Sequence, residues 1–145
     1  ALDEVELAIL DMADKIILVV TPDIPAVKDA RLFFEVTEAL GYPEEKVSLV
    51  LNKADRQSAI GPDEISAGLK RPVLVSIAAD TRAAYTAANQ GIPCILNNRA
   101  SPIAQGVAKL AQVLYAELQA VAQSAPAPVE EAKQTTGILS RLLRK

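Results

Sequence analysis

The sequence contains no histidine and a single cysteine, Cys94. Without histidine, the chain cannot build a Ser-His or Cys-His catalytic pair from its own residues, nor the usual zinc sites. One cysteine excludes an internal disulfide and a Cys-rich metal site. We interpret Cys94 as a small buried hydrophobic residue rather than a nucleophile, because no cationic partner is evident near it.

Long apolar runs are also absent. No run approaches the roughly 20 residues needed to cross a bilayer, and no secretory signal is visible, although half of the 145 residues are hydrophobic,. This composition suffices for one domain with a sizeable core. The chain starts at Ala1 rather than at methionine and runs almost at once into an apolar segment. We interpret that start as a cut through a longer protein, and a cytoplasmic location is the default.

Charge is distributed unevenly along the chain. All 18 acidic residues but only 11 of the 15 cationic ones lie within the first 132 residues, which therefore carry a net charge of −7. An acidic body of this kind argues against general nucleic-acid binding by the body. The remaining cations form a basic tail that comprises Lys133, Arg141, Arg144 and Lys145.

Three short apolar segments, 16–20, 47–51 and 73–77, predict β-strands,. Their nearly continuous apolar character is typical of strands buried on both faces of a parallel sheet. Helical segments alternate with them, so right-handed crossovers are expected. The prediction for residues 1–122 is an α/β fold, a Rossmann-like parallel sheet in a three-layer α/β/α arrangement. Three strands make a small sheet, from which we infer that neighbouring strands lie upstream of the sequence.

Apolar periodicity and capping residues predict the helices. Pro25 fits the first turn of a helix whose inward face includes Leu40,. Asp80 and Ser101 are the N-caps expected for two later helices, and the short run 94–96 is interpreted as extended. The expected helices cover residues 2–12, 25–40, a short stretch after Gly61-Pro62, 81–90, and a long segment that begins at Pro102.

Polar residues follow the middle apolar segment directly, namely Asn52, Lys53 and Asp55. A buried parallel strand ends at the carboxyl edge of its sheet, where α/β proteins bind ligands. An amide, a cation and a carboxylate at that edge can recognise a flat polar group such as a nucleotide base. A polar turn that caps the strand is the alternative. Among the other candidates, Arg82 is interpreted as solvated surface and Tyr85 as a packing residue of its helix.

The C-terminal 23 residues differ in composition from the rest. Residues 123–136 are rich in Ala, Pro, Glu, Gln and Thr, which predicts a flexible, disordered linker,. Residues 137–145 read G-I-L-S-R-L-L-R-K and predict a basic amphipathic helix that folds mainly on contact with a surface. Anionic lipid is the favoured surface; a protein partner, the chain's own domain and a solvated tail are the alternatives. The membrane-binding residues would be Ile138, Leu139, Arg141, Leu142, Leu143, Arg144 and Lys145.

Four stretches occur together in a characteristic order. They are A-D-K-I-I-L-V-V-T-P-D-I-P-A-V-K-D-A from residue 13, L-V-L-N-K-A-D from residue 49, A-A-D-T-R-A-A-Y-T-A-A-N-Q-G-I-P from residue 78, and S-P-I-A-Q-G-V-A-K-L-A from residue 101. This succession resembles the C-terminal half of MinD/ParA-type (SIMIBI-class) P-loop ATPases, most closely the CpaE-like branch associated with Flp/Tad pilus assembly. The basic tail is similar to the membrane-targeting helix of MinD proteins.

The resemblance implies a nucleotide site. Members of the family bind ATP and Mg²⁺, dimerise around the nucleotide and cycle between ATP and ADP states by hydrolysis. It implies that Asn52 reads the adenine base, that Lys53 covers the base or stays in solvent, and that the loop from Ala78 to Asp80 lines base and ribose. Pilus-assembly or localisation proteins would be the partners, and the place of action would be the inner face of the cell membrane.

The departures from the family pattern limit these expectations. The sequence has no Gly-rich loop ending in Lys-Ser/Thr, which would bind phosphates through backbone amides,. The resemblance places that loop and the Walker B strand upstream of Ala1, so the chain is not expected to hydrolyse ATP alone. Two alternatives remain: an ATPase-like pilus scaffold without hydrolysis, and a GTPase remnant in which Asp55 of the N-K-x-D pattern accepts from guanine.

Overall fold

The computed structural model describes residues 3–55, 57–58 and 60–124. The described residues divide into two units, one that ends at Leu114 and one that begins at Tyr115. The first unit contains the sheet and the first 13 of the 23 residues of the last helix. Among the described residues, no helix combines the length and apolar character that crossing a bilayer requires.

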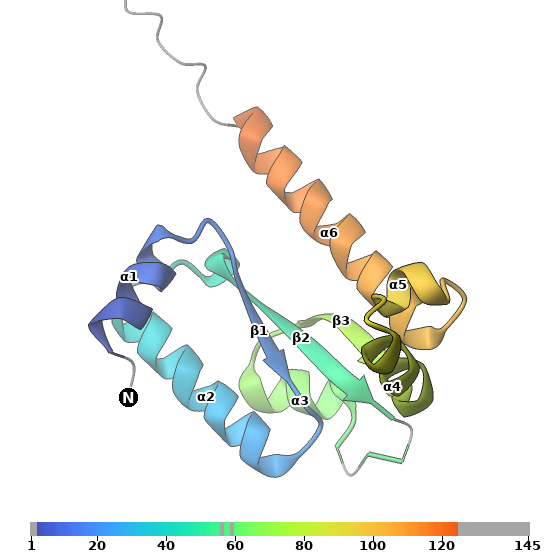
Figure 1. Cartoon of the computed structure of the whole chain (residues 1–145). Coiled ribbons are helices and arrows are strands. Elements are labelled where there is room, and N and C mark those ends of the chain that lie inside the picture. Colours follow the sequence, from blue (N-terminus) through green and yellow to red (C-terminus); the bar gives the residue numbers. More distant parts are fainter. Residues whose placement is uncertain (1–2, 56, 59, 125–145) are drawn as a thin grey trace, which may run out of the picture. The chain divides into compact units, whose positions relative to one another are not determined.

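A three-stranded parallel sheet in the order β1-β2-β3 lies at the centre of the first unit (Figure 1). Its strands are β1 (Ile16–Val20), β2 (Val47–Ala54) and β3 (Val73–Ala78). Ile16 lies opposite Val47, and Val50 opposite Val75. The predicted parallel α/β sheet is confirmed. The middle strand is buried on both faces from Ser48 to Leu51, as its apolar run indicates.

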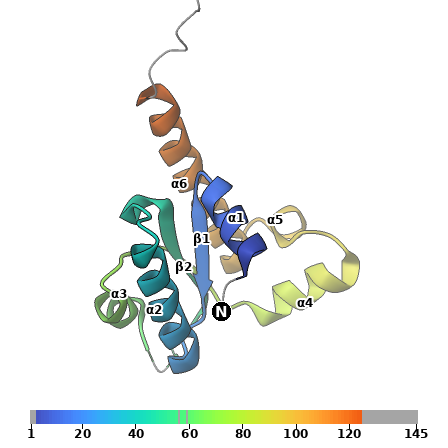
Figure 2. The same cartoon turned by 90° about the vertical axis from the view of Figure 1, so that its left-hand side faces the viewer.

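One face of the sheet is covered by α2 (Ile24–Ala39) and α3 (Pro62–Leu69). Figure 2 shows both helices on the same side of β1 and β2. The core on this face comprises Val20, Ala30, Phe34, Leu49, Leu51, Ile65 and Leu69. Asp23 caps α2, and Pro25 lies in the first turn, where the sequence placed it. The inward placement of Leu40 was wrong: it is 45% exposed because α2 ends at Ala39, and Thr37 is buried instead.

The other face is covered by the first part of α6 (Pro102–Ser124). Here Val50, Val75 and Ile77 of the sheet pack against Ile103, Val107, Leu110 and Val113. Ser101 caps the helix, since its Oγ accepts the Ala104 N–H at 3.3 Å. The helix runs through Ser124, two residues into the range 123–136 expected to be a linker. Residues 125–145, including the predicted amphipathic tail, lie outside the described residues.

The edge strand β1 is buried on one face only. Ile17 is 40% exposed and Val19 56% exposed, so the prediction of a strand buried on both faces was wrong for β1. The reason is that the cluster beneath α6 takes its strand residues from β2 and β3 alone. Helix α1 (Glu4–Met12), which precedes β1, likewise has no buried residue.

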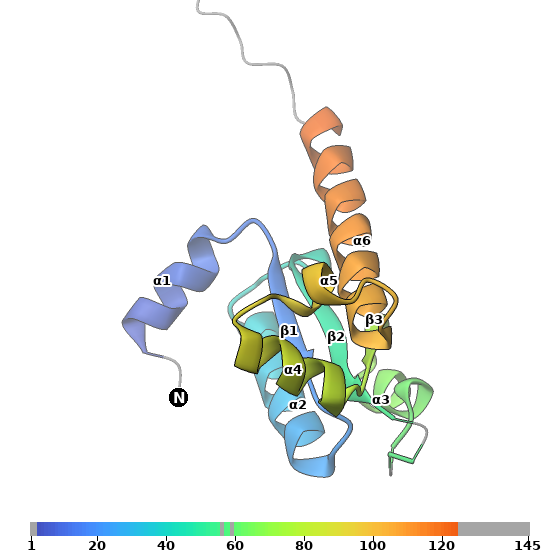
Figure 3. The same cartoon turned by 45° about the vertical axis from the view of Figure 1, so that its right-hand side comes forward.

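The remaining helices are η1 (Glu44–Lys46), α4 (Thr81–Gln90) and α5 (Cys94–Asn97). Asp80 caps α4, and Gly91 ends it in the left-handed conformation with φ 64°. Helices α4 and α5 contact each other (Figure 3). The extended conformation expected for 94–96 was wrong, because the Leu96 and Asn97 N–H groups both donate to the Pro93 carbonyl and close a helical turn.

Candidate functional site

A cavity of about 400 Å³ lies at the carboxyl edge of the sheet. Its volume falls within the roughly 300–1,000 Å³ of typical small-molecule sites. We call it the β2–β3 cavity, because the ends of these strands form part of its lining. It is lined by Asn52, Lys53, Ala78, Ala79, Asp80, Thr81, Ala84, Tyr85 and Ile103. Four of the five residues predicted from the sequence as base-binding therefore lie together: Asn52, Lys53, Ala78 and Asp80.

Asn52 and Lys53 form a bulge inside β2. The strand does not stop at Asn52 but continues to Ala54, with a shift of register against β3 between Leu51 and Ala54. Lys53 adopts a left-handed conformation with φ 55°, which is uncommon for a residue with a side chain,. The Asn52 Oδ1 accepts the Lys53 N–H at 2.9 Å and so stabilises the bulge. Bulges of this kind redirect side chains and occur often beside functional sites.

The same hydrogen bond fixes what Asn52 can offer to a ligand. Its carbonyl oxygen accepts from the Lys53 backbone with one of its two lone pairs, which orients the amide,. Its Nδ2 group is a donor that can act on a ligand, and the oxygen keeps a second lone pair with which to accept. Asn52 is half-buried in the lining of the cavity, while the Lys53 side chain is exposed. The site thus presents a directed donor and a solvated cation at one end.

Asp80 acts as a helix cap as well as a lining residue. Its Oδ1 accepts the Ala83 N–H at 3.0 Å, which satisfies one free donor of the first turn of α4,. This cap fixes where α4 begins relative to β3. As a consequence Thr81, Ala84 and Tyr85, spaced by three and four residues, lie on the face of α4 that lines the cavity,.

Asp55 does not line the β2–β3 cavity. Its Oδ1 accepts the Gln57 N–H at 3.1 Å, and its own N–H donates to the Ser58 Oγ at 3.3 Å. The carboxylate is thus part of the turn that follows β2. This is the strand-capping role weighed as the alternative for this stretch.

Sequence reasoning did not assign Thr81, Ala84, Tyr85 or Ile103 to the site. The signal available for the first three was helical spacing after the Asp80 cap. Ile103 comes from a helix 50 residues beyond Lys53, and nothing in its apolar periodicity distinguishes lining a cavity from packing on a strand. The packing role expected for Tyr85 was wrong, since its side chain is 68% exposed.

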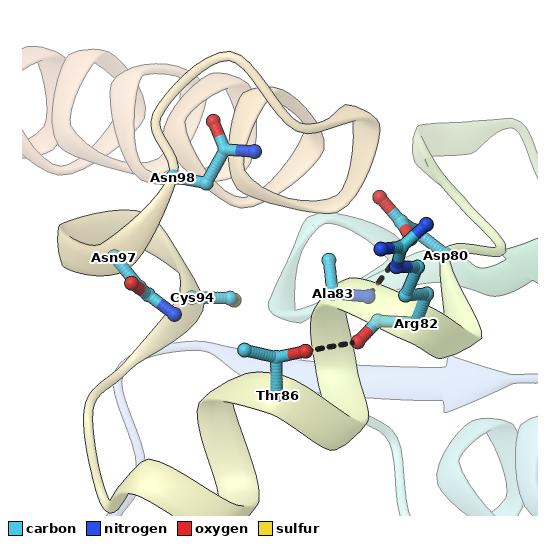
Figure 4. Close-up of a pocket in the computed structure, with 7 residues that line it drawn as sticks. All are labelled: Asp80, Arg82, Ala83, Thr86, Cys94, Asn97 and Asn98. Carbon is cyan, nitrogen blue, oxygen red and sulfur yellow. Dashed lines mark hydrogen bonds between the residues drawn. The ribbon is translucent and has the colours of Figure 1, made fainter.

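A second cavity of about 370 Å³ lies between α4 and α5 (Figure 4). It shares Asp80 with the first cavity and is lined further by Arg82, Ala83, Thr86, Cys94, Asn97 and Asn98. The Thr86 hydroxyl donates to the Arg82 carbonyl at 2.9 Å. Cys94 is half-buried here rather than fully buried as expected. The lining of this second cavity is mostly polar, whereas Ala84, Tyr85 and Ile103 give the β2–β3 cavity apolar walls.

Charged groups near the strand ends act as caps. At the end of β1 the Thr21 hydroxyl and the Ala26 N–H both donate to Asp23, and these hydrogen bonds hold the pKa of its carboxyl below the ordinary value. No group of three His, Cys, Asp or Glu side chains suited to a metal ion occurs in the part of the chain that the structure describes.

Comparison with known proteins finds curated proteins of similar sequence. No protein-family model matches the chain. The septum site-determining protein MinD of Thermotoga maritima is 26% identical over 110 residues, 72% of this chain and 40% of that protein. An uncharacterized ATP-binding protein of Methanocaldococcus jannaschii is 35% identical over 106 residues, 72% of this chain and 39% of that protein. The chain thus spans about two fifths of the length of the curated relatives it matches.

Solved structures match most of the chain in fold. A ParA family ATPase from Chlorobium tepidum superposes with a TM-score of 0.70 at 23% identity, over 77% of this chain and 47% of that one. The chain has the fold of MinD/ParA-type P-loop ATPases. MinD of Pyrococcus horikoshii, solved with Mg-ADP, matches this MinD/ParA fold with a TM-score of 0.69 at 23% identity, over 83% of this chain and 49% of that one.

Proposed function

We propose that the β2–β3 cavity binds the adenine base of ATP or ADP, and that the chain is the base-binding part of a MinD/ParA-like ATPase. The observation that carries the proposal is the convergence of Asn52, Lys53, Ala78 and Asp80 on one cavity at the carboxyl edge of the sheet. In open parallel sheets, ligands bind at this edge. The related MinD of Pyrococcus horikoshii was solved with Mg-ADP, which supports the same class of ligand.

The chemistry of the cavity suits a purine base. Ala78, Ala84, Tyr85 and Ile103 supply apolar walls for the ring faces, and Asn52 supplies an amide donor for a ring nitrogen. Guanine recognition by an N-K-x-D pattern needs the aspartate to accept from the base. Asp55 instead accepts from Gln57 and lies outside the lining, which favours adenine over guanine.

The phosphates of the nucleotide need a partner that this sequence does not contain. No Gly-rich loop ending in Lys-Ser/Thr occurs in its 145 residues,. We therefore propose that hydrolysis, Mg²⁺ binding and dimerisation around the nucleotide belong to the intact protein and that the chain alone is inactive. The intact protein would act as a membrane-associated localisation or pilus-assembly switch at the inner face of the cell membrane.

Nucleotide titrations test the base-binding role of Asn52. We expect the chain to bind ATP in preference to GTP, with weak affinity because the phosphates lack their loop. Replacing Asn52 with Asp keeps an oxygen for the Lys53 N–H but removes the donor amide. Loss of one directed hydrogen bond in a half-buried site should lower ATP affinity by about five- to tenfold. The measurement is isothermal titration calorimetry with each nucleotide.

The matched control for Asn52 is Asp55→Ala. Asp55 lies two residues after Lys53 but outside the lining of the cavity, so we expect this variant to bind ATP like the unaltered chain. The opposite outcome, a GTP preference that Asp55→Ala abolishes, would instead support the GTPase alternative.

Vesicle binding tests the proposed role of the tail, residues 137–145. We expect the chain to sediment with anionic vesicles and to be released by salt. Leu142→Glu places a charge in the apolar arc formed by Ile138, Leu139, Leu142 and Leu143. Since each buried CH₂ contributes about 0.8 kcal/mol, this variant should bind at least about tenfold more weakly.

Ser140→Glu is the control for the tail experiment, because it adds the same charge outside the apolar arc. We expect it to weaken vesicle binding much less than Leu142→Glu does. Equal effects of the two substitutions would mean that charge alone attracts the tail. Binding indifferent to both would favour a protein partner or a solvated tail.

A further inference from the structure

Tyr85 is the one aromatic residue among those that line the β2–β3 cavity. It lies on α4 together with Thr81 and Ala84; Ala84 and Tyr85 follow Thr81 by three and four residues, the spacings that place side chains on the same side of a helix,. Ile103 of α6 adds a further apolar wall. A flat apolar ring system entering this cavity would therefore meet one aromatic ring and several aliphatic side chains.

The three tyrosines of the chain differ in how their hydroxyl groups are held. The Tyr42 hydroxyl donates to Asp11, and the Tyr115 hydroxyl accepts from the Gln119 Nε2 at 2.6 Å. No hydrogen-bond partner for the Tyr85 hydroxyl occurs among the described residues, and 68% of this residue is exposed. A large aromatic ring thus remains accessible at a cavity whose other lining residues are mostly small.

We propose that Tyr85 stacks on the base of the bound nucleotide and so provides much of the affinity of the chain for nucleosides. This inference rests on the proposed function of the β2–β3 cavity. It assigns distinct roles to two residues. Stacking on an aromatic side chain is tolerant of base identity, because every base has a π-face. Discrimination between bases then falls to the directed amide of Asn52, which recognises an edge.

Equilibrium dialysis of the full 145-residue chain against adenosine and guanosine tests the division of roles. Nucleosides are used because they report on base contacts without the phosphates. We expect Tyr85→Ala to lower the affinity for both nucleosides by the same factor, at least about fivefold, as alanine substitution at stacking residues does. Asn52→Asp should instead change the ratio of the two affinities. Tyr85→Phe, which keeps the ring, should bind like the unaltered chain.

Tyrosine fluorescence gives a second readout that a merely structural role would not move. The sequence has three tyrosines and no tryptophan, so its near-ultraviolet emission comes from tyrosine. With excitation at the red edge of the tyrosine absorption band, the emission of the chain should fall as adenosine binds. The adenosine concentration at the midpoint of this quenching should equal the midpoint of binding measured by equilibrium dialysis. Tyr85→Phe should bind adenosine without this quenching. Tyr115→Phe should keep both binding and quenching, because Tyr115 is not among the residues that line the cavity.

The outcomes separate this inference from the proposed function. Adenosine binding that is unchanged in Tyr85→Ala, without quenching in the unaltered chain, overturns the stacking role and leaves the proposed cavity standing. Absence of saturable adenosine binding by the unaltered chain overturns both. Thermal unfolding of Tyr85→Ala should match the unaltered chain, since the side chain is exposed, so a loss of binding will not reflect loss of the fold.

Discussion

Replacing Gly106 with Val is expected to destabilise the fold by about 1–3 kcal/mol, the usual effect of overpacking a close contact. Gly106 lies on α6 where this helix crosses β3. A Cβ atom built at this position would lie 3.1 Å from the Ile77 Cα and 3.2 Å from both the Cγ1 and Cγ2 atoms of that side chain. Because the nearest atom belongs to the backbone of a buried strand, α6 would have to move. The measurement is the free energy of unfolding from urea titration.

The same substitution at Gly68 is the control. Gly68 lies in α3, and a Cβ atom there would meet nothing within 4 Å. We expect Gly68→Val to leave stability unchanged or slightly raised, because glycine is a poor helix former. Equal destabilisation by the two variants would show that valine disfavours these helices for reasons other than the contact with Ile77.

Gly106 also bears on the proposed site. Ile103, one turn earlier on α6, lines the β2–β3 cavity, and Ile77 directly precedes the lining residue Ala78. The missing side chain at position 106 allows α6 to approach β3 closely enough for Ile103 to reach the cavity. A helix displaced by Gly106→Val should therefore weaken nucleoside binding as well as the fold.

Local chemistry made much of this architecture predictable. The apolar runs identified all three strands, and Asp80 and Ser101 cap the helices expected of them. The site residues were predictable to the extent that they follow strands, because the carboxyl ends of parallel strands meet at one edge. That argument brought Asn52 and Asp80 together, although they are separated by an entire helix and strand.

Features that depend on tertiary packing were not predictable. The bulge at Lys53 has no glycine or asparagine at its left-handed residue, and the Asn52 side chain that stabilises it precedes that residue. The three residues 94–96 are too few for periodicity to separate a helical turn from an extended piece. Likewise, an apolar run does not reveal whether a helix covers it. For this reason the exposure of Ile17 and Val19 of β1 was not predicted from the sequence.

Truncation of Leu51 to Ala is the second substitution with a large expected effect. Leu51 is 1% exposed and packs in the core beneath α2 and α3 with Phe34 and Ile65. Deleting its buried methyl groups should cost about 2–5 kcal/mol, from lost burial and from the cavity left behind. Domains are typically stable by only about 5–15 kcal/mol, so this is a large share of the total. Urea unfolding monitored by circular dichroism measures it.

Ile17→Ala provides the comparison for Leu51, since both are large aliphatic residues on the same sheet. Ile17 is 40% exposed, and we expect its truncation to cost about 1 kcal/mol or less, mainly through strand propensity,. Similar costs for the two variants would mean that the exposed face of β1 is covered in solution, contrary to the structure. We expect instead a large difference in the free energy of unfolding between the two variants. If Leu51→Ala also loses nucleoside binding in proportion to the fraction unfolded, the binding role of Asn52 depends on the folded state of the strand that carries it.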